Sequence, residues 1–325
     1  MTVAGAGVTP RRVAIRHGWT IGIYLLMMIL LWIEVAVAPA FTSFDLGSLI
    51  IGTMPLAFAA MAQATVVISG GIDLSVGSVM ALINVASAKF MEGEAIGTAL
   101  LIAAVLIVMG ALIGASTGLA VTLTKVPDIV VTLATSFIWG GVALLVLREP
   151  GGGAPIEFTD IGGAATFWEW IPNGAIVIAV VLIAVWLPIR WRKPGYAIYA
   201  IGSNREAAHL SGVNVPRTQV LAYALGGVFA ALGGLALTAT TGIGSPYSGE
   251  FYTLNSVAAV VLGGVSLLGG KGGLAGPVAA AFCLTIIIAI MTFMGVDPNY
   301  AQVIQGGLIV LVVMAGGLVL LRRRA

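Results

Sequence analysis

Long, nearly uninterrupted apolar runs dominate the pattern of hydrophobic and polar positions along the chain. A bilayer core about 30 Å thick needs about 20 apolar residues per crossing helix. About ten runs approach that length. The expected spans are Trp19–Val37, Leu46–Ile68, Leu74–Ala88, Ala95–Thr117, Ile129–Leu147, Ala175–Ile189, Val220–Thr238, Ser256–Leu268, Leu274–Phe293 and Val303–Leu321.

Composition supports the same class. Hydrophobic residues make up 59% of the 325 positions and charged residues only 9%, whereas a soluble domain carries roughly 25% charged residues. A water-soluble globular protein is therefore excluded. The sequence predicts an all-α polytopic membrane protein with about ten transmembrane helices. Its membrane domain covers residues 19–321, between an N-terminal tail of residues 1–18 and a basic end of residues 322–325.

The lysines and arginines predict the orientation, because cytoplasmic loops carry the excess of positive charge. If the N-terminus is cytoplasmic and ten spans alternate, only Lys89 and Arg148 fall on the outer side. Both termini are then expected in the cytoplasm. The net charge is only +2, and no basic stripe with interleaved aromatic residues is present, so nucleic acid is not expected as a partner.

Two hydrophilic loops are long enough to have a structure of their own. The outer loop Arg148–Pro172 reads as an interfacial loop or as a docking surface for an extracytoplasmic partner. The inner loop Arg190–Gln219 contains a capping box, with Ser203 as the N-cap residue and Glu206 three positions later. Gly212 would end the short helix. From spacing alone, this helix is either an idle interfacial helix or a lever that contacts a cytoplasmic partner.

Several segments match part of a catalytic motif but lack the surrounding sequence or structure that the motif requires. Ser116 lies in a G-x-S-x-G match, but that motif requires a strand-to-helix turn, and glycines four residues apart are typical of close helix packing in membranes. Lys271 follows two glycines without the rest of a phosphate-binding loop. Cys283 lies inside an apolar run, where it is expected to be a buried core residue. We therefore expect no catalytic residue, no metal site and no cofactor in this chain.

Ionisable residues inside the spans are scarce. Glu34 alone lies well inside a span, near its outer end, where its carboxylate could reach the interface, and Asp73 lies at a glycine-rich break. Ion-coupled carriers usually need more embedded charge. The pattern favours an external energy source and a neutral substrate.

Four segments in order resemble the ribose-type sugar permeases of ATP-binding cassette (ABC) importers. Together they cover most of the chain from about Gly52 to Asn299. They are Gly70-Gly71-Ile72-Asp73-Leu74-Ser75-Val76-Gly77-Ser78, Lys125-Val126-Pro127 with Val131-Thr132-Leu133-Ala134-Thr135, the segment from Gly202 to Asn214, and the segment from Asn255 to Gly264 continuing to Gly272.

The resemblance implies an ABC importer permease of the vitamin-B12/ribose type in a bacterial inner membrane. Two permease chains, identical or paralogous, would form the pore. ABC ATPase subunits would bind below, and a periplasmic or lipid-anchored sugar-binding protein would deliver the sugar from above. The inner loop resembles the motif that couples importers to their ATPase, with Ser203, Asn204, Arg205, Glu206, Ala207, Ala208 and Gly212 as its residues.

The other candidate residues divide into two groups. The signature break contains Gly70, Gly71, Asp73, Ser75 and Gly77, for which helix capping and a gating role both remain open. A sugar needs hydrogen-bond partners that replace lost water. Candidates for the substrate pathway, for each of which helix–helix hydrogen bonding is an equal alternative, are Gln63, Asn84, Thr132, Thr135, Asn255 and Ser256, with Trp139 as a stacking face. The main rival function is a secondary transporter that works without an ATPase.

Overall fold

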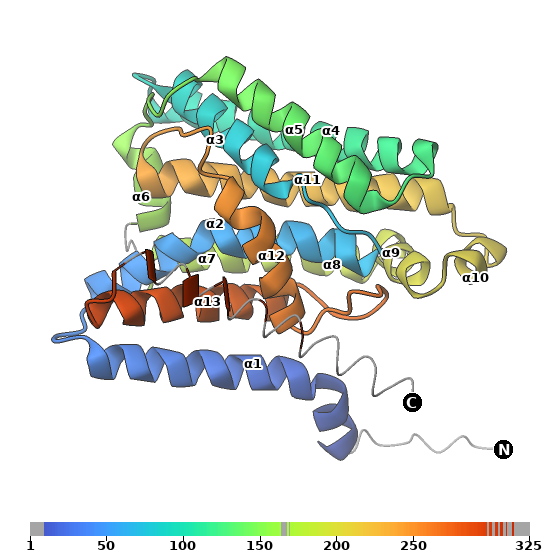
Figure 1. Ribbon diagram of the computed structural model, residues 1–325, viewed down its shortest axis with the longest axis horizontal. Helices are drawn as coiled ribbons and strands as arrows, with labels where there is room; N and C mark the ends of the chain where they lie inside the picture. The colour runs from blue at the N-terminus through green and yellow to red at the C-terminus, as the bar shows by residue number, and fades with distance from the viewer. Residues whose placement is uncertain are drawn as a thin grey trace.

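The computed structural model describes residues 10–163, 168 and 170–297 and isolated positions from 299 to 314, with side chains described from residue 18. In this part of the chain the regular elements are all helical (Figure 1). The helices are α1 (Pro10–Val37), α2 (Ser43–Ile68), α3 (Val76–Met91), α4 (Ile96–Thr124), α5 (Asp128–Val146), α6 (Ile156–Gly163), α7 (Asn173–Val180), a π-helical segment (Val181–Trp186), α8 (Leu187–Arg190), α9 (Lys193–Ser203), α10 (Arg205–Leu210), α11 (Val215–Thr241), α12 (Glu250–Leu262) and α13 (Ala275–Phe293).

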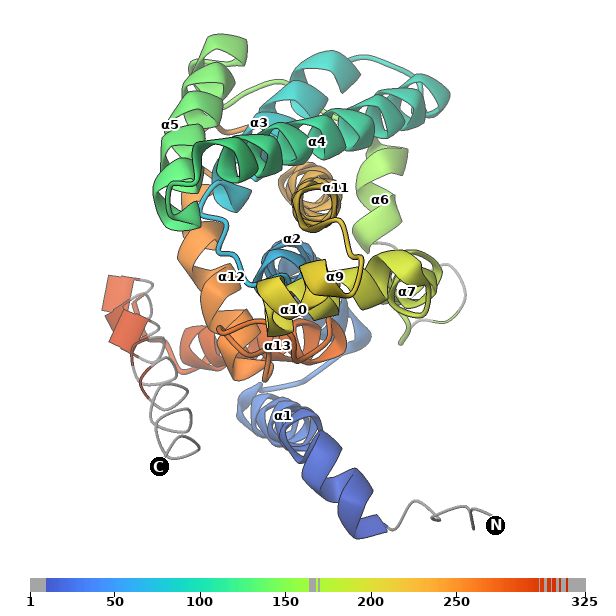
Figure 2. The same cartoon turned by 90° about the vertical axis from the view of Figure 1, so that its right-hand side faces the viewer.

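Helix α2 forms the centre of the bundle. Figure 2 looks along the bundle and shows α2 surrounded by α11, α12 and α13, with α9 and α10 in front. Nearly all of α2 from Thr53 to Ile68 is buried, which is expected of a helix that is apolar on every face. The other spans therefore form a shell around it, and α1 packs mainly on α13 at the edge.

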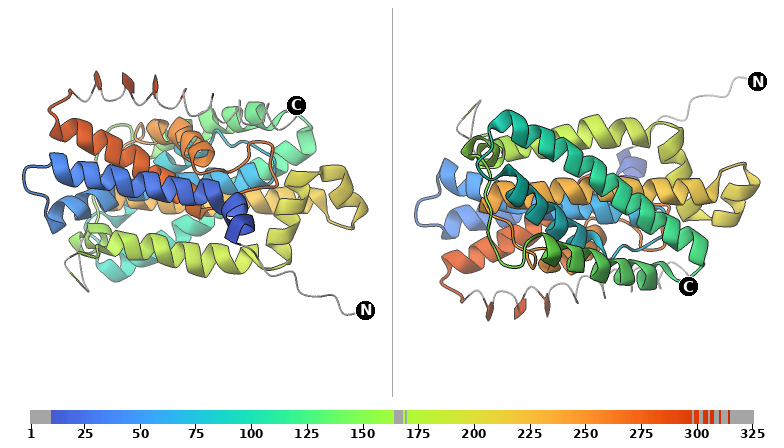
Figure 3. Two further views of the ribbon diagram at one scale, coloured as in Figure 1. Left: turned by 90° about the horizontal axis from the view of Figure 1, so that it is seen from below. Right: turned by 90° about the horizontal axis from the view of Figure 1, so that it is seen from above.

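Glycines allow α4 and α11 to pack closely, as the spacing of Gly110, Gly114 and Gly118 predicts. A side chain on Gly110 would collide with the Gly227 carbonyl, and one on Gly114 would collide with the Tyr223 carbonyl. In the right panel of Figure 3, α4 crosses α11 diagonally. This stretch of Gly-Ala-Ser-Thr-Gly is thus a helix–helix contact, as small residues in membrane helices usually are.

The bundle has two distinct ends, visible in Figure 1. Helices α9 and α10, the start of α1 and the turn between α4 and α5 lie at one end, here called the α10 end. Helix α6 and the turn between α1 and α2 lie at the other, here called the α6 end.

Seven described helices are long and apolar enough to cross a membrane. They match seven of the expected spans, with ends that differ by up to seven residues: Gly18–Val37, Ser43–Ile68, Ile96–Thr124, Asp128–Val146, Asn173–Arg190, Val215–Thr241 and Ala275–Phe293. Most of the expected span Val303–Leu321 falls outside the described residues. The total of ten therefore stays a prediction.

The two short spans were placed imprecisely. The expected span Ser256–Leu268 is wrong in its position, because α12 begins at Glu250 and ends at Leu262, where the chain turns through several glycines. The expected span Leu74–Ala88 is helix Val76–Met91. The first turns of α3 and α12 meet at Gly77, where any side chain would collide with the Gly249 carbonyl and the Thr253 hydroxyl.

Two further helices were missed by the sequence analysis. The outer loop contains α6, Ile156–Gly163, and the inner loop contains α9, Lys193–Ser203, before its expected short helix. Their eight and eleven residues are too short to give a clear periodic signal.

Candidate functional site

A short helix projects from the α10 end at the place where the sequence predicts a lever. Helix α10 has six residues, Arg205–Leu210, and only Ala208 among them is buried. Leu210, at the end of this helix, is 81% exposed. Gly212, at a φ of 82°, ends it with the left-handed conformation that a helix stop requires. The segment is a compact knob with most of its surface free for a partner.

The cap of this helix differs from the expected one. Asn204, not Ser203, is the N-cap residue, and its Oδ1 accepts a hydrogen bond of 2.9 Å from the Ala207 amide. Ser203 instead ends α9. The predicted capping box is therefore wrong: with Asn204 as the N-cap residue the third helical position is Ala207, which has no side-chain acceptor. Asn caps as well as Ser, and α9 extends to Ser203. Glu206 lies in the first turn of α10, where its negative charge interacts favourably with the positive end of the helix dipole.

Three of the resembling segments meet at the end of α9, just before α10 begins. A side chain on Gly202 would collide with the Ile68 carbonyl and the Gly270 amide. The Gly270 amide donates a hydrogen bond of 2.9 Å to the Ile68 carbonyl. A side chain on Gly269 would lie within 2.9 Å of the Gly70 Cα. We call this contact of Gly70, Gly202, Gly269 and Gly270 the glycine junction; it explains why these positions lack side chains.

Helix α9 is tied to the same loop by a tyrosine. The Tyr199 hydroxyl donates to the Gly272 carbonyl over 2.8 Å, and the Arg190 guanidinium lies 6.0 Å from the centre of the Tyr199 ring. Burial raises the pKa of the Tyr199 hydroxyl, against the lowering effect of Arg190. The hydroxyl therefore remains a donor at neutral pH.

The signature break is ordered around Asp73. This carboxylate is 4% exposed and its Oδ1 accepts bonds from the Ser75 amide, 2.8 Å, and the Ser75 hydroxyl, 2.6 Å. Both bonds fix the turn that leads into α3. Asp73 thus orders the turn just before α3, whose N-cap residue Ser75 makes no side-chain cap bond. Capping and gating roles both stay predictions.

A polar cluster beside the break was missed by the sequence analysis. Asp128, the first residue of α5, accepts a hydrogen bond of 3.3 Å from the Tyr223 hydroxyl of α11. Its Oδ2 also lies 3.9 Å from the Arg205 guanidinium of α10. A side chain on Gly71 would lie 2.6 Å from Asp128 Oδ2 and 2.8 Å from the Tyr223 hydroxyl. The sequence signal that could have pointed to Asp128 is its position directly after Pro127, at the expected start of a helix.

Asn84 is the most fully bonded of the pathway candidates. Its amide nitrogen donates to the Thr238 hydroxyl, 2.9 Å, and to the Ile243 carbonyl, 3.1 Å. Its Oδ1 accepts from the Ser245 amide, 2.8 Å, and the Ser248 hydroxyl, 3.2 Å. In this conformation the side chain ties α3 to α11 and to the loop that follows α11.

Two candidates on α5 lie at the break or near α3. Thr132 donates over 3.3 Å to the Ile72 carbonyl within the break. The Thr135 hydroxyl bonds the Thr132 carbonyl of its own helix. One turn after Thr132, the Ser136 hydroxyl lies 2.7 Å from the Ser78 hydroxyl, and this contact joins α5 to α3.

The remaining candidates lie on α12 and α2. Asn255 and Ser256 bond the Phe251 and Thr253 carbonyls of their own helix. Gln63 is fully buried in α2, and neither of its amide atoms has a hydrogen-bond partner. The polar candidates are thus spread over four helices, and their role in a pathway stays a prediction.

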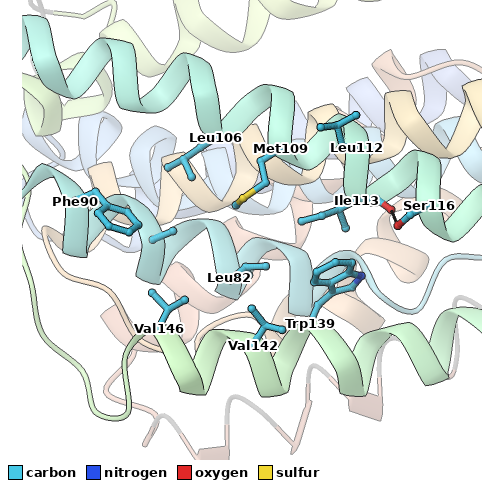
Figure 4. A pocket seen from close by; sticks show the side chains of 11 residues that line it. Leu82, Phe90, Leu106, Met109, Leu112, Ile113, Ser116, Trp139, Val142 and Val146 are labelled. Atoms are coloured by element: carbon cyan, nitrogen blue, oxygen red, sulfur yellow. Dashed lines mark hydrogen bonds between the residues drawn. The ribbon is translucent and has the colours of Figure 1, made fainter.

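Trp139 lies against an apolar cavity rather than a polar one. The cavity measures about 380 Å³ and lies between α3, α4 and α5. Figure 4 shows Leu82, Ile113 and Val142 pointing into it from the three helices, with the Trp139 ring at one end. Its lining offers no set of polar groups for a sugar; the Ser116 hydroxyl at its edge bonds the Ile113 carbonyl.

Glu34 does not reach the interface. The side chain is only 1% exposed, and its Oε2 has no hydrogen-bond partner. The expected outward reach is therefore wrong, because α1 turns this face toward the bundle. Cys283 is buried as expected, and no cluster of metal-ligating side chains occurs among the described residues.

Comparison with known proteins agrees with this geometry. The family model for the branched-chain amino acid transport system permease component matches residues 46–313. The ribose import permease of Escherichia coli strain K12 is 31% identical over 297 residues, which cover 89% of this chain and 90% of that protein. The galactose/methyl galactoside import permease of Salmonella typhimurium is 32% identical over 321 residues, 93% of this chain and 95% of that protein.

A third relative extends the range of sugars in the relatives' names. The fructose import permease of Rhizobium meliloti is 33% identical over 264 residues, 78% of this chain and 72% of that protein. No solved structure matches the chain. The chain therefore belongs to the branched-chain amino acid transport permease family and, within it, to the monosaccharide ABC import permeases.

Proposed function

We propose that the chain is the transmembrane subunit of an ATP-driven importer of a monosaccharide, with ATP hydrolysis on a separate chain. The observation that carries the proposal is the exposed knob of α10, which directly follows the end of α9 at the glycine junction. An idle interfacial helix would not require three distant segments to meet at its base. The names of the import permease relatives support sugar as the substrate class.

Charge supports placing the α10 end in the cytoplasm of a bacterial inner membrane, with both termini on that side. The basic residues in the helices and turns of this end contrast with the acidic α6 end. They are Lys125, Arg190, Arg192, Lys193, Arg205, Arg217 and Lys271, whereas Asp45, Glu92, Glu94, Glu157 and Asp160 lie toward the α6 end.

The proposed cycle is alternating access between two permease chains, identical or paralogous. A sugar-binding protein docks on the acidic α6 end, where complementary charge favours encounter and register. An ATPase seats α10 in a groove, and its closure tilts the helices attached to the glycine junction. The sugar then passes along the polar candidates Gln63, Asn84, Thr132, Thr135, Asn255 and Ser256, with Trp139 as a stacking face.

Reconstitution tests the proposal directly. The chain is purified with the ATPase and the binding protein encoded beside it, and uptake of ribose, galactose and fructose into proteoliposomes is measured. We expect accumulation of one sugar that requires ATP and the binding protein. A non-hydrolysable ATP analogue serves as the control.

The second candidate is an ion-driven carrier, which the buried Glu34 favours, since its Oε2 has no hydrogen-bond partner. Accumulation by the chain alone, without nucleotide, would support this carrier and refute the importer. Glu34→Gln distinguishes the two further, since it should abolish carrier activity but leave ATP-driven uptake close to normal.

A further inference from the structure

One carboxylate lies between α10 and the signature break. Asp128 begins α5, and its Oδ2 faces Arg205 on α10, Tyr223 on α11 and Gly71 in the break. These groups come from four segments that are far apart in the sequence. Asp128 thus pairs with α10 through Arg205 and lies tightly against the break at Gly71, separately from the backbone contacts of the glycine junction.

The two sides of this contact differ in strength. On the α11 side, Tyr223 is fully buried and its hydroxyl donates directly to the carboxylate. On the α10 side, the Arg205 side chain is 47% exposed and its nitrogen lies 3.9 Å away. A half-exposed ion pair at this distance is weak and screened by solvent. The Arg205 contact can therefore break and re-form while Asp128 and Tyr223 stay together.

The start of α5 makes a second contact with the break, through a hydrogen bond to Ile72. Thr132, one turn after Asp128, donates to the Ile72 carbonyl over 3.3 Å. Gly71 has no room for a side chain because Asp128 and Tyr223 occupy that space. Any displacement of the Asp128 end of α5 therefore reaches residues 71 and 72, which lead into the Asp73 turn and α3.

We infer that Asp128 is a positioning residue that transmits displacement of α10 through its Arg205 contact to the signature break, and so to the start of α3. The inference rests on the proposed function and deepens it: the ATPase moves α10, and Asp128 decides whether that movement reaches the transport path. Coupling between sites requires an element with two arrangements, and the Arg205–Asp128 contact, formed in one state and open in the other, supplies it.

The test separates hydrolysis from transport in the complete complex. ATP hydrolysis and sugar uptake are measured in the same proteoliposomes for the unmodified complex and for Asp128→Asn, Arg205→Gln and the double variant. We expect each single variant to lower the sugar taken up per ATP at least about fivefold, a change of about 1 kcal/mol in coupling, while hydrolysis persists. The double variant should be no worse than either single variant, because both remove the same contact.

Matched controls exclude a general loss of charge or structure. Arg217→Gln removes an exposed cation at the same end of the bundle and should leave the ratio unchanged. Arg205→Lys keeps the charge and should retain most of the ratio. If Asp128→Asn fails to assemble, Tyr223→Phe removes the hydroxyl from the same carboxylate and should lower the ratio in the same direction.

Two results would overturn the inference: ratios within twofold of the unmodified complex in both single variants, or losses in the double variant that equal the product of the two single losses. An unmodified complex without ATP-dependent uptake would instead refute the proposed function. The two failures are therefore distinguishable.

Discussion

The side-chain amide of Asn84 on α3 donates a hydrogen bond of 2.9 Å to the hydroxyl of Thr238 on α11. The Ser87 hydroxyl, one turn later on α3, also contacts the Thr238 hydroxyl. Polar side chains thus join a short helix to a full-length one in a region where lipid offers no alternative hydrogen-bond partners.

Replacement of Asn84 should reduce stability. Asn84→Ala removes the acceptor of the Ser245 amide, and a buried group left unpaired costs about 1–3 kcal/mol. The Ile243 carbonyl keeps its bond from the Thr241 hydroxyl. We expect a lower melting temperature of the purified protein, whereas Thr135→Ala, which removes a bond within one helix, should change it little. A raised KM for sugar with an unchanged melting temperature would instead indicate contact with substrate.

The glycine junction should not tolerate a methyl group. Gly202→Ala forces its Cβ into the Ile68 carbonyl, and overpacking of this kind costs about 1–3 kcal/mol. Thermal unfolding checks the loss. Gly97→Ala is the matched control, because no atom lies within 4 Å of its added Cβ, and it should be neutral or stabilising. Equal melting temperatures for the two variants would contradict the close contact.

The packing of α4 on α11 makes a similar prediction for a different pair of helices. Gly114→Val should reduce the free energy of unfolding by about 1–3 kcal/mol through overpacking. A lower melting temperature would show this loss. Ser116→Ala, two residues away, should leave the melting temperature nearly unchanged and the rate of sugar uptake within twofold of normal. Loss of activity in the serine variant with normal stability would revive a catalytic role for Ser116.

Reversal of charge on α10 should disconnect the ATPase. Glu206 is exposed in the first turn of α10, so Glu206→Lys should leave membrane insertion intact. We expect about tenfold weaker binding of the ATPase, about 1.4 kcal/mol, together with loss of uptake. Co-purification of the ATPase measures the effect. Glu157→Lys on α6 is the control for ATPase binding alone, which it should leave unchanged. Normal binding and transport in Glu206→Lys would refute the lever.

Labelling can establish the orientation of the bundle. In a Cys283→Ala background, Leu210→Cys on α10 should react with a membrane-impermeant thiol reagent only in inside-out vesicles. Glu157→Cys on α6 should react only in right-side-out cells. Both positions are exposed, so reactivity reports the side of the membrane, and the opposite pattern would reverse the proposed topology.

Much of the architecture follows from local sequence. Each apolar run of about 20 residues that the structure describes forms a helix, because a bilayer leaves backbone groups no other partners. The helix stop at Gly212 and the close contacts of Gly110 and Gly114 were also readable from residue type and spacing. Helices α6 and α9 and the start of α12 were not, because short elements leave little periodic signal.

The sequence by itself determined a helical membrane protein, its candidate spans and a short helix between two of them, because hydropathy and capping act within a few residues. Only the tertiary structure decided that Gly70, Gly202, Gly269 and Gly270 meet, that Asn84 is engaged by α11, and that Asp128 lies between Arg205 and Tyr223. These contacts join residues far apart in the chain, and helix packing alone sets which of them approach.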